Sequence, residues 1–219
     1  MVPHRRCSAW RSLSPLWRVS VAGRTLDFSW QTADASAGRI ELASAYGSLV
    51  QTDTATLDLR GAGQSGDAGA LRLSAVNGTV PLGGSIQSAA SSGARGAQFD
   101  IDAGRLTDLG AVAHAIAAGH GDNAAQSFQV RVRQGDVQLS SADAIHAHRI
   151  GIAADGGNAA TVPLDGAVRI EGQLDARGAS AGRIEVYALQ SIALGATARL
   201  DAAADAAGQD GGSVLLSAR

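Results

Sequence analysis

The chain has 219 residues, a formal net charge of −2 and 45% hydrophobic residues, so it can bury a core and is not a disordered tail. Aromatic residues make up only 4% of it, whereas it holds 28 glycines, which suits thin stacked layers with frequent turns better than a compact enzyme core. It has no lysine and no basic stripe interleaved with aromatics, which argues against a nucleic-acid partner, and no apolar run long enough for a transmembrane helix.

Residues 1–20 form a segment that we can place in no repeat and expect to be poorly ordered. Basic residues open it as they would a signal peptide, but no uninterrupted apolar stretch follows, so the chain has no recognisable signal peptide. Cys7 is the only cysteine, which excludes an internal disulfide, and we expect it to be incidental rather than catalytic. Residues 21–219 are expected to form a single β domain.

The domain contains an internal repeat, visible in the segments that begin at Gly38 and Gly182. Each opens with Gly-Arg-Ile-Glu and an apolar residue, and each then reaches a Leu-Asp pair at nearly the same distance from its first glycine. A further glycine closes each segment, Gly69 in the first and Gly212 in the second. The resulting period of about 30 residues indicates a stack of similar layers.

The Leu-Asp pair recurs four times, and each time a glycine and a new strand follow. Three of the pairs stand at the same distance from that glycine, whereas a shorter turn follows Leu174-Asp175; the pairs are Leu26-Asp27, Leu57-Asp58, Leu174-Asp175 and Leu200-Asp201. An aspartate just before a turn can accept backbone N–H groups, so we expect these carboxylates to shape the turns.

Strands within the repeat alternate strictly between apolar and charged residues, as in Ile40-Glu41-Leu42 and Leu71-Arg72-Leu73. Such strands are buried on one face and solvated on the other. The turns are long and mixed rather than two-residue hairpin loops, and about three short strands fit in each period. We therefore predict an all-β fold, a parallel β-helix in which each coil buries its apolar face on the next.

One segment departs from this alternation. In residues 106–119, apolar residues recur at helical spacing, and Gly119 fits the position of a C-cap. We predict a short helix over 107–118, within an insert over about 106–126 that leaves the coil, with strands resuming at Phe128.

The repeat GGxIxLxA, an apolar pair, LDAxG and a glycine-rich turn resembles the large filamentous-haemagglutinin-type exoproteins of Gram-negative bacteria. The resemblance covers about residues 37–219 and is best over 166–219. It implies a right-handed parallel β-helix shaft, secretion by the two-partner route through an outer-membrane transporter, and an adhesive role at the cell surface. The family's N-terminal secretion domain has no counterpart in this sequence, so we expect a longer parent protein.

The histidines are the first candidates for a metal site. His114, His120 and Asp122 lie close together in the chain, and His146 and His148 are two apart, so a straight strand would place them on one face. No cysteine joins them and no third ligand stands at a recognised spacing, so we predict exposed histidines and no metal.

The acids are the candidates for catalysis. Asp100 and Asp102 share a strand face, and many polysaccharide lyases and hydrolases are β-helices with aspartates in a groove. A catalytic set should be concentrated, whereas the Leu-Asp acids recur with the coil. We therefore expect no catalytic residues, and keep a carbohydrate-active β-helix enzyme as the alternative.

No cofactor is expected. Residues 208–213 and 66–69 contain Gly and Asp but do not form a calcium-binding nonapeptide series. A phosphate-binding GxxxxGK[ST] loop needs lysine, and no GxSxG elbow is present.

The sequence thus favours a non-catalytic structural or adhesive shaft segment of a secreted or surface exoprotein. Contacts with host-cell or surface glycans and proteins are expected at the insert and at the longer turns, residues 60–69 and 202–212. A non-functional remnant is a further alternative, because uncapped ends of a stack expose apolar layers and strand edges.

Overall fold

The computed structural model describes residues 17–106, 108–119, 125–157 and 165–219. In this part of the chain there are seventeen strands and one helix, α1, Leu109–Ala117. The strands are β1 Arg18–Ser20, β2 Thr25–Asp27, β3 Thr32–Asp34, β4 Arg39–Ser44, β5 Thr56–Asp58, β6 Ala70–Ala75, β7 Ser85–Gln87, β8 Gln98–Ala103, β9 Ala125–Val132, β10 Val137–Leu139, β11 Ala144–Ala154, β12 Val168–Ile170, β13 Gln173–Asp175, β14 Arg183–Ala188, β15 Ile192–Leu194, β16 Arg199–Asp201 and β17 Ser213–Ala218.

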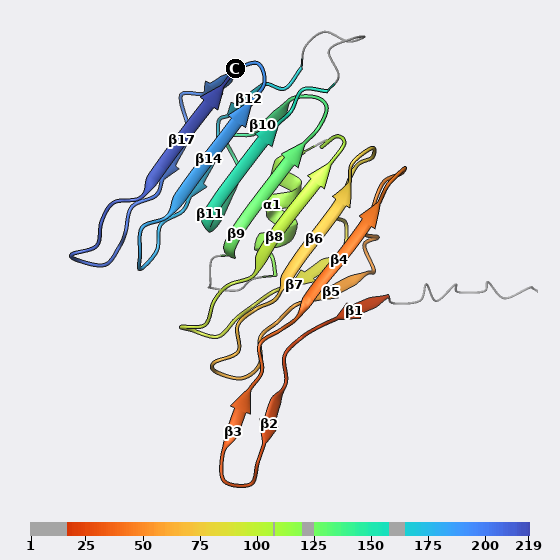
Figure 1. The fold of residues 1–219 in the computed structure, drawn as a ribbon, viewed down its shortest axis with the longest axis vertical. Coiled ribbons are helices and arrows are strands. Elements are labelled where there is room, and N and C mark those ends of the chain that lie inside the picture. The colour runs from red at the N-terminus through yellow and green to blue at the C-terminus, as the bar shows by residue number, and fades with distance from the viewer. Residues whose placement is uncertain (1–16, 107, 120–124, 158–164) are drawn as a thin grey trace, which may run out of the picture.

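A long parallel sheet dominates the molecule, which we call the main sheet: β4, β6, β8, β9, β11, β14 and β17 side by side in that order (Figure 1). The pairing is in register, so each position of one strand faces the same position of the next. The register brings one inward apolar residue of each strand into a continuous row: Ile40, Leu71, Phe99, Phe128, Ile150, Ile184 and Val214.

The strand alternation expected from the sequence is confirmed. In β6, Leu71 and Leu73 are buried while Arg72 between them is exposed. The period is confirmed as well, since Arg39 pairs with Ala70 and Arg183 pairs with Ser213, in each case the matching position of the following layer. The fold is therefore mostly β and built from parallel strands, as the sequence predicted.

Shorter parallel ladders lie behind the main sheet in Figure 1: β1-β5-β7 and β10-β12-β15. In a third ladder, the first residues of β11 pair with β13, and β13 pairs with β16. From Ala147 onward, β11 belongs to the main sheet instead. The strand therefore turns a corner near Ala147 and His148, and the two Leu-Asp pairs of β13 and β16 stack directly.

The first Leu-Asp pair does not join these ladders, contrary to the sequence prediction. Leu26 is half exposed, at 50%, and belongs to an antiparallel hairpin of β2 and β3. The carboxylate of Asp27 accepts the N–H of Ser29, which adopts a φ of 67° and reverses the chain. In place of this pair, Val19 and Ser20 of β1 lie beside Leu57 and Asp58 of β5. Both residues precede the domain start expected from the sequence.

The predicted helix is confirmed, with bounds two residues shorter at its start and one at its end. Asp108 is the N-cap, and its carboxylate accepts the N–H of Ala111. The apolar face of α1 is buried in the core, with Leu109, Val112, Ala113 and Ile116. The helix contacts β7, β10 and β11, so it fills the stack between two strand ladders and is not an outward excursion.

The C-cap of α1 is Ala118 and not Gly119, which the sequence had predicted. Gly119 has a different role. A Cβ on Gly119 would lie 1.4 Å from the carbonyl oxygen of Ile86, so only glycine allows this approach to β7. The Gly119 carbonyl accepts the N–H of Ser88 just beyond that strand. The glycine thus anchors the end of α1 to the stack.

Candidate ligand-binding groove

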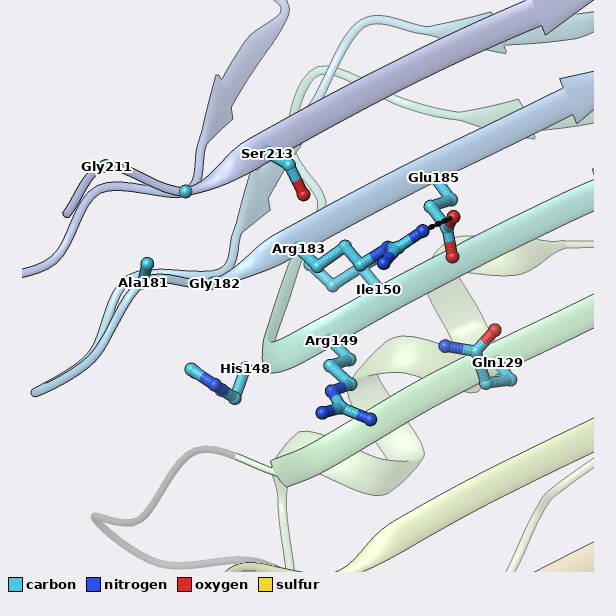
Figure 2. A pocket seen from close by; sticks show the side chains of 11 residues that line it. Gln129, His148, Arg149, Ile150, Ala181, Gly182, Arg183, Glu185, Gly211 and Ser213 are labelled. Carbon is cyan, nitrogen blue, oxygen red and sulfur yellow. Dashed lines mark hydrogen bonds and ion pairs between the residues drawn. The ribbon is translucent and has the colours of Figure 1, made fainter.

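The outer face of the main sheet carries a polar groove of about 520 Å³ that crosses β9, β11, β14 and β17 (Figure 2). We call it the Arg149 groove. Three strands supply most of its lining, and two glycine-containing turns close one end. Its lining residues are Gln129, His148, Arg149, Ile150, Ala181, Gly182, Arg183, Glu185, Gly211, Gly212 and Ser213.

Two arginines of the groove differ in their partners. Arg183 donates through Nη2 to Oε1 of Glu185 at 2.5 Å, which lowers the pKa of Glu185 and raises that of Arg183. Tyr187 donates to the same carboxylate oxygen at 3.2 Å. Arg149 is exposed, and its guanidinium has no hydrogen bond or ion pair with any residue that the structure describes. It is the free positive charge of this groove.

Gly151 follows Arg149 by two residues in β11 and is buried, although its position in the strand faces outward. Gly151 lies opposite Gln129 and Glu185 in the ladder, where neighbouring strands carry long side chains. A Cβ on Gly151 would lie 1.9 Å from Oε1 of Gln129, so the Gln129 side chain rests across β11 at this glycine. The amide of Gln129 is thereby held beside the groove.

A second polar hollow of about 410 Å³ adjoins the first and shares Gln129 with it. Polar residues of the earlier strands line it, among them the exposed Arg39 and Gln98 and the half-buried Ser127. Arg72 lies between two acids there, 3.9 Å from Glu41 and 3.6 Å from Asp100. The two hollows follow one another across the strands of the main sheet.

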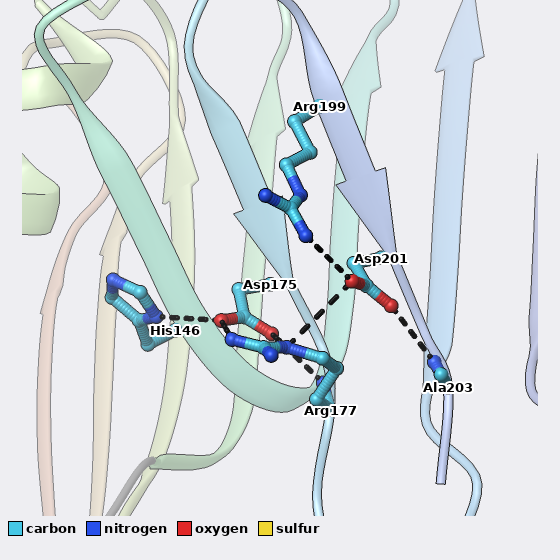
Figure 3. A network of polar contacts seen from close by, with 6 residues as sticks. All are labelled: His146, Asp175, Arg177, Arg199, Asp201 and Ala203. Atoms are coloured by element: carbon cyan, nitrogen blue, oxygen red, sulfur yellow. Dashed lines mark hydrogen bonds and ion pairs between the residues drawn. The ribbon is translucent and has the colours of Figure 1, made fainter. Parts of the chain in front are cut away.

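The acids of the Leu-Asp pairs form a separate polar network on another side of the molecule (Figure 3). Arg177 donates to both carboxylate oxygens of Asp175, at 3.0 and 2.8 Å, and lies 3.7 Å from Asp201. Arg199 contacts Asp201 at 3.4 Å, and Nδ1 of His146 lies 3.4 Å from Asp175. The Arg177 hydrogen bonds lower the pKa of Asp175 to about 2.

The expected turn-shaping role of these aspartates is confirmed. Each accepts the backbone N–H of the residue two positions later: Asp27 from Ser29, Asp58 from Arg60, Asp175 from Arg177 and Asp201 from Ala203. Asp58 is fully buried, and Arg60 and Arg18 bind its carboxylate and hold its pKa far below the usual range.

The arginine partners of these acids were missed in the sequence. Leu57-Asp58-Leu-Arg60 and Leu174-Asp175-Ala-Arg177 share the pattern Leu-Asp-x-Arg. Two positions of spacing along an extended chain put both side chains on one face, so the pattern could have predicted the pairing.

The candidate histidines that the structure describes do not come together. His146 contacts Asp175, whereas His148 lines the Arg149 groove, because β11 bends between them instead of running straight. Nε2 of His114 lies 3.2 Å from Asp143. His120 and Asp122 lie outside the described residues. Within the described ranges no three His, Cys, Asp or Glu side chains gather as metal ligands.

The strand acids Asp100 and Asp102 have different partners. Arg133 donates to both oxygens of Asp102 at 2.7 Å, which lowers the pKa of that carboxyl, while Asp100 faces Arg72. The two acids therefore share the outward face of β8, as expected from the sequence, but each pairs with a different arginine.

Among the predicted contact loops, residues 60–69 are tied to the β2–β3 hairpin. Asp34 accepts the N–H groups of Gln64 and Ser65 at 2.7 and 3.2 Å and the hydroxyl of Thr25 at 2.7 Å. The Thr25 hydrogen bond is the main cause of a lowered pKa of Asp34. This loop is held in place and does not project freely.

No helix in the described ranges is both long and apolar enough to cross a membrane. Comparison with protein-family models, curated proteins and solved structures found no match to the chain. The fold and the groove are therefore interpreted from their own geometry.

Proposed function

We propose that the chain is a non-catalytic structural and adhesive shaft segment, wound as a right-handed parallel β-helix. The observation that carries the proposal is the in-register stacking of the main sheet, where one inward apolar row crosses seven strands. Stacks of this kind extend by adding layers and present a long wall of outward side chains.

The arrangement of the acids supports a non-catalytic role. The Leu-Asp carboxylates are bound by neighbouring arginines and backbone N–H groups, and they recur along the stack. A carboxylate held by a bidentate arginine is a poor general acid, because its pKa is lowered. Asp102 has the same kind of partner in Arg133.

The resemblance to filamentous-haemagglutinin-type exoproteins adds the cellular setting to this proposal. The parent protein would be secreted with the help of an outer-membrane transporter and would act at the cell surface. Layers such as the Gly38 and Gly182 repeats would lengthen its fibre, and the outer wall and loops would make the contacts.

The test displays the full chain on inert beads and measures both adhesion and turnover. The proposal expects beads to adhere to host-type cells or surface glycans above the level of beads that carry denatured chain. It expects no release of reducing or unsaturated ends from a panel of polysaccharides. Turnover of any of them would support the carbohydrate-active enzyme instead, and adhesion no better than the denatured control would contradict the adhesive role.

A further inference from the structure

The outward row that begins at Arg39 of β4 crosses the main sheet without a single acid. Register places seven residues side by side in it: Arg39, Ala70, Gln98, Ser127, Arg149, Arg183 and Ser213. The next outward row, in contrast, contains Glu41, Asp100 and Glu185. At the usual spacing of about 4.8 Å between strands, the acid-free row is about 29 Å long.

The two polar hollows described above lie along this acid-free row, and each also has one acid of the next row in its lining, Glu185 in the first and Asp100 in the second. The Arg149 groove takes in Arg149, Arg183 and Ser213, and the adjoining hollow takes in Arg39, Gln98 and Ser127. Gln129 borders both. The row is therefore hollowed along most of its length, and a linear molecule laid across the strands would contact all of it.

The row offers two kinds of recognition. Arg149 and Arg39 are exposed guanidinium groups without a partner among the described residues, and guanidinium forks bind carboxylates in a bidentate manner. Between them stand amides and hydroxyls, which both donate and accept hydrogen bonds. An alternation of carboxylates and hydroxyls on the ligand would match this lining.

Other linear or extended partners fit less well. Single-stranded nucleic acid needs exposed aromatic rings for its bases, but among the described residues of the two linings the one Phe, Tyr or Trp is Phe99, which is buried. A membrane surface attracts clusters of several basic residues, whereas Arg183 and Arg72 already have acidic partners.

We propose that the acid-free row binds a linear, carboxylate-bearing polysaccharide, with Arg149 holding a uronate carboxylate in the groove that bears its name. Gln129 and Ser213 then hydrogen-bond the hydroxyls of the neighbouring sugar rings. This inference rests on the proposed adhesive function and gives it a ligand class. It also moves the contact from the loops to the wall of the stack.

The experiment measures binding of galacturonic-acid oligomers to the purified chain by calorimetry, beside the same oligomers methyl-esterified at their carboxyls. The acidic oligomers should bind and the esters should bind at least fivefold more weakly, because esterification removes the charge that Arg149 recognises. Arg149→Gln should weaken binding of the acidic oligomers about fivefold, as expected for one solvent-exposed ion pair.

Matched variants separate this site from general charge effects. Arg105→Gln removes an exposed arginine that lines neither hollow and should leave the affinity unchanged. Gly151→Ala should displace the Gln129 side chain and weaken binding while the far-ultraviolet spectrum and melting temperature stay those of the parent.

Three outcomes would overturn the ligand assignment: equal binding of acid and ester, equal loss in the Arg149 and Arg105 variants, or tighter binding of an oligothymidylate than of the uronate. None of these outcomes tests the proposed function as an adhesive shaft, which is tested separately by the adhesion of the beads. Binding followed by cleavage of the oligomer would leave the site in place and contradict the non-catalytic function.

Discussion

Strands in the middle of the stack and the last strand, β17, carry apolar residues at the same inward positions, but these side chains are buried in the middle and exposed in β17. In the fourth position of the main-sheet strands, Leu73 of β6 is 1% exposed, whereas Leu216 of β17 is 39% exposed. Both are leucines in the same inward row, since that row runs from Leu42 through Leu73 to Leu216. The pattern gives the direction of a side chain, and only a layer on each side makes that side chain core.

The remaining exposed apolar residues follow the same division. Among the described residues, the large exposed hydrophobic side chains all lie before Gln51 or after Val186: Trp17, Val19, Leu26, Phe28, Trp30, Tyr46, Val50, Tyr187, Leu194, Val214, Leu215 and Leu216. Most belong to the first or last layers of the stack. Between them, the large hydrophobic side chains that the structure describes are buried or half-buried.

The largest expected difference between the regions comes from truncating the two leucines. Leu73→Ala should lower the free energy of unfolding by about 3 kcal/mol, because it opens a cavity between two covering layers. Leu216→Ala should cost less than about 1 kcal/mol, because solvent already reaches that side chain. Urea unfolding followed by circular dichroism gives both values, and equal costs would show that the end layer is packed as tightly as the middle.

A pair of glycines makes the same comparison for the backbone. Gly119→Ala should destabilise the fold by about 2 kcal/mol, because its Cβ would strike the carbonyl of Ile86 and force α1 away from β7. Gly211 in the last turn has open space around it, so Gly211→Ala should stay within about 0.5 kcal/mol of the parent. Thermal melts of the two variants check this, and a harmless Gly119→Ala would mean that α1 is loosely attached.

The buried acid of β13 should give the middle of the stack a distinct acid sensitivity. The folded pKa of Asp175 is about 2, below its ordinary value of 3.8, so its ion pair stabilises the fold above pH 4. That contribution, about 2 kcal/mol, should be lost as the pH falls from about 4 to about 2.

Variants at the two stacked acids isolate this contribution. Asp175→Asn should reduce the stability difference between pH 5 and pH 2.5 by about 2 kcal/mol, whereas Asp201→Asn, in the more exposed last layer, should reduce it by less. Unfolding curves at several pH values provide the measurement. An unchanged pH profile in Asp175→Asn would assign the acid sensitivity to other carboxyls, such as Asp58.

Much of the fold was predictable from the sequence because it depends on local alternation and on a period. The strand faces, the parallel stacking, the helix near residue 109 and the turn-shaping aspartates were all expected. The place of α1 inside the stack was not, because helical spacing shows an apolar face without showing what covers it. The hairpin at Leu26 was missed for a similar reason: the Leu-Asp pair looks the same in either setting, and Ser29 decides the turn.

The groove was less predictable than the fold. Arg149 and Arg183 are distant in the sequence and become neighbours only through the register of β11 and β14. The layer that contains the bend of β11 differs in length from the other layers, so the sequence repeat does not align Arg149 with Arg183. The bend also separates His146 from His148, which a straight strand would have kept together.

The smallest predicted effect concerns the first layers, where Asp34 ties the β2–β3 hairpin to the loop 60–69. Asp34→Ala should speed hydrogen exchange at the amides of Gln64 and Ser65 by about tenfold and leave the global unfolding midpoint unchanged, because only this local contact opens. The Arg95 amide, which donates to Asp67 at 2.8 Å, serves as an internal control and should keep its rate. If the two target amides also kept their rates, the loop would be held by its own backbone bonds, such as the one from Gly66 to Ala62, and the hairpin would be an independent end piece of the stack.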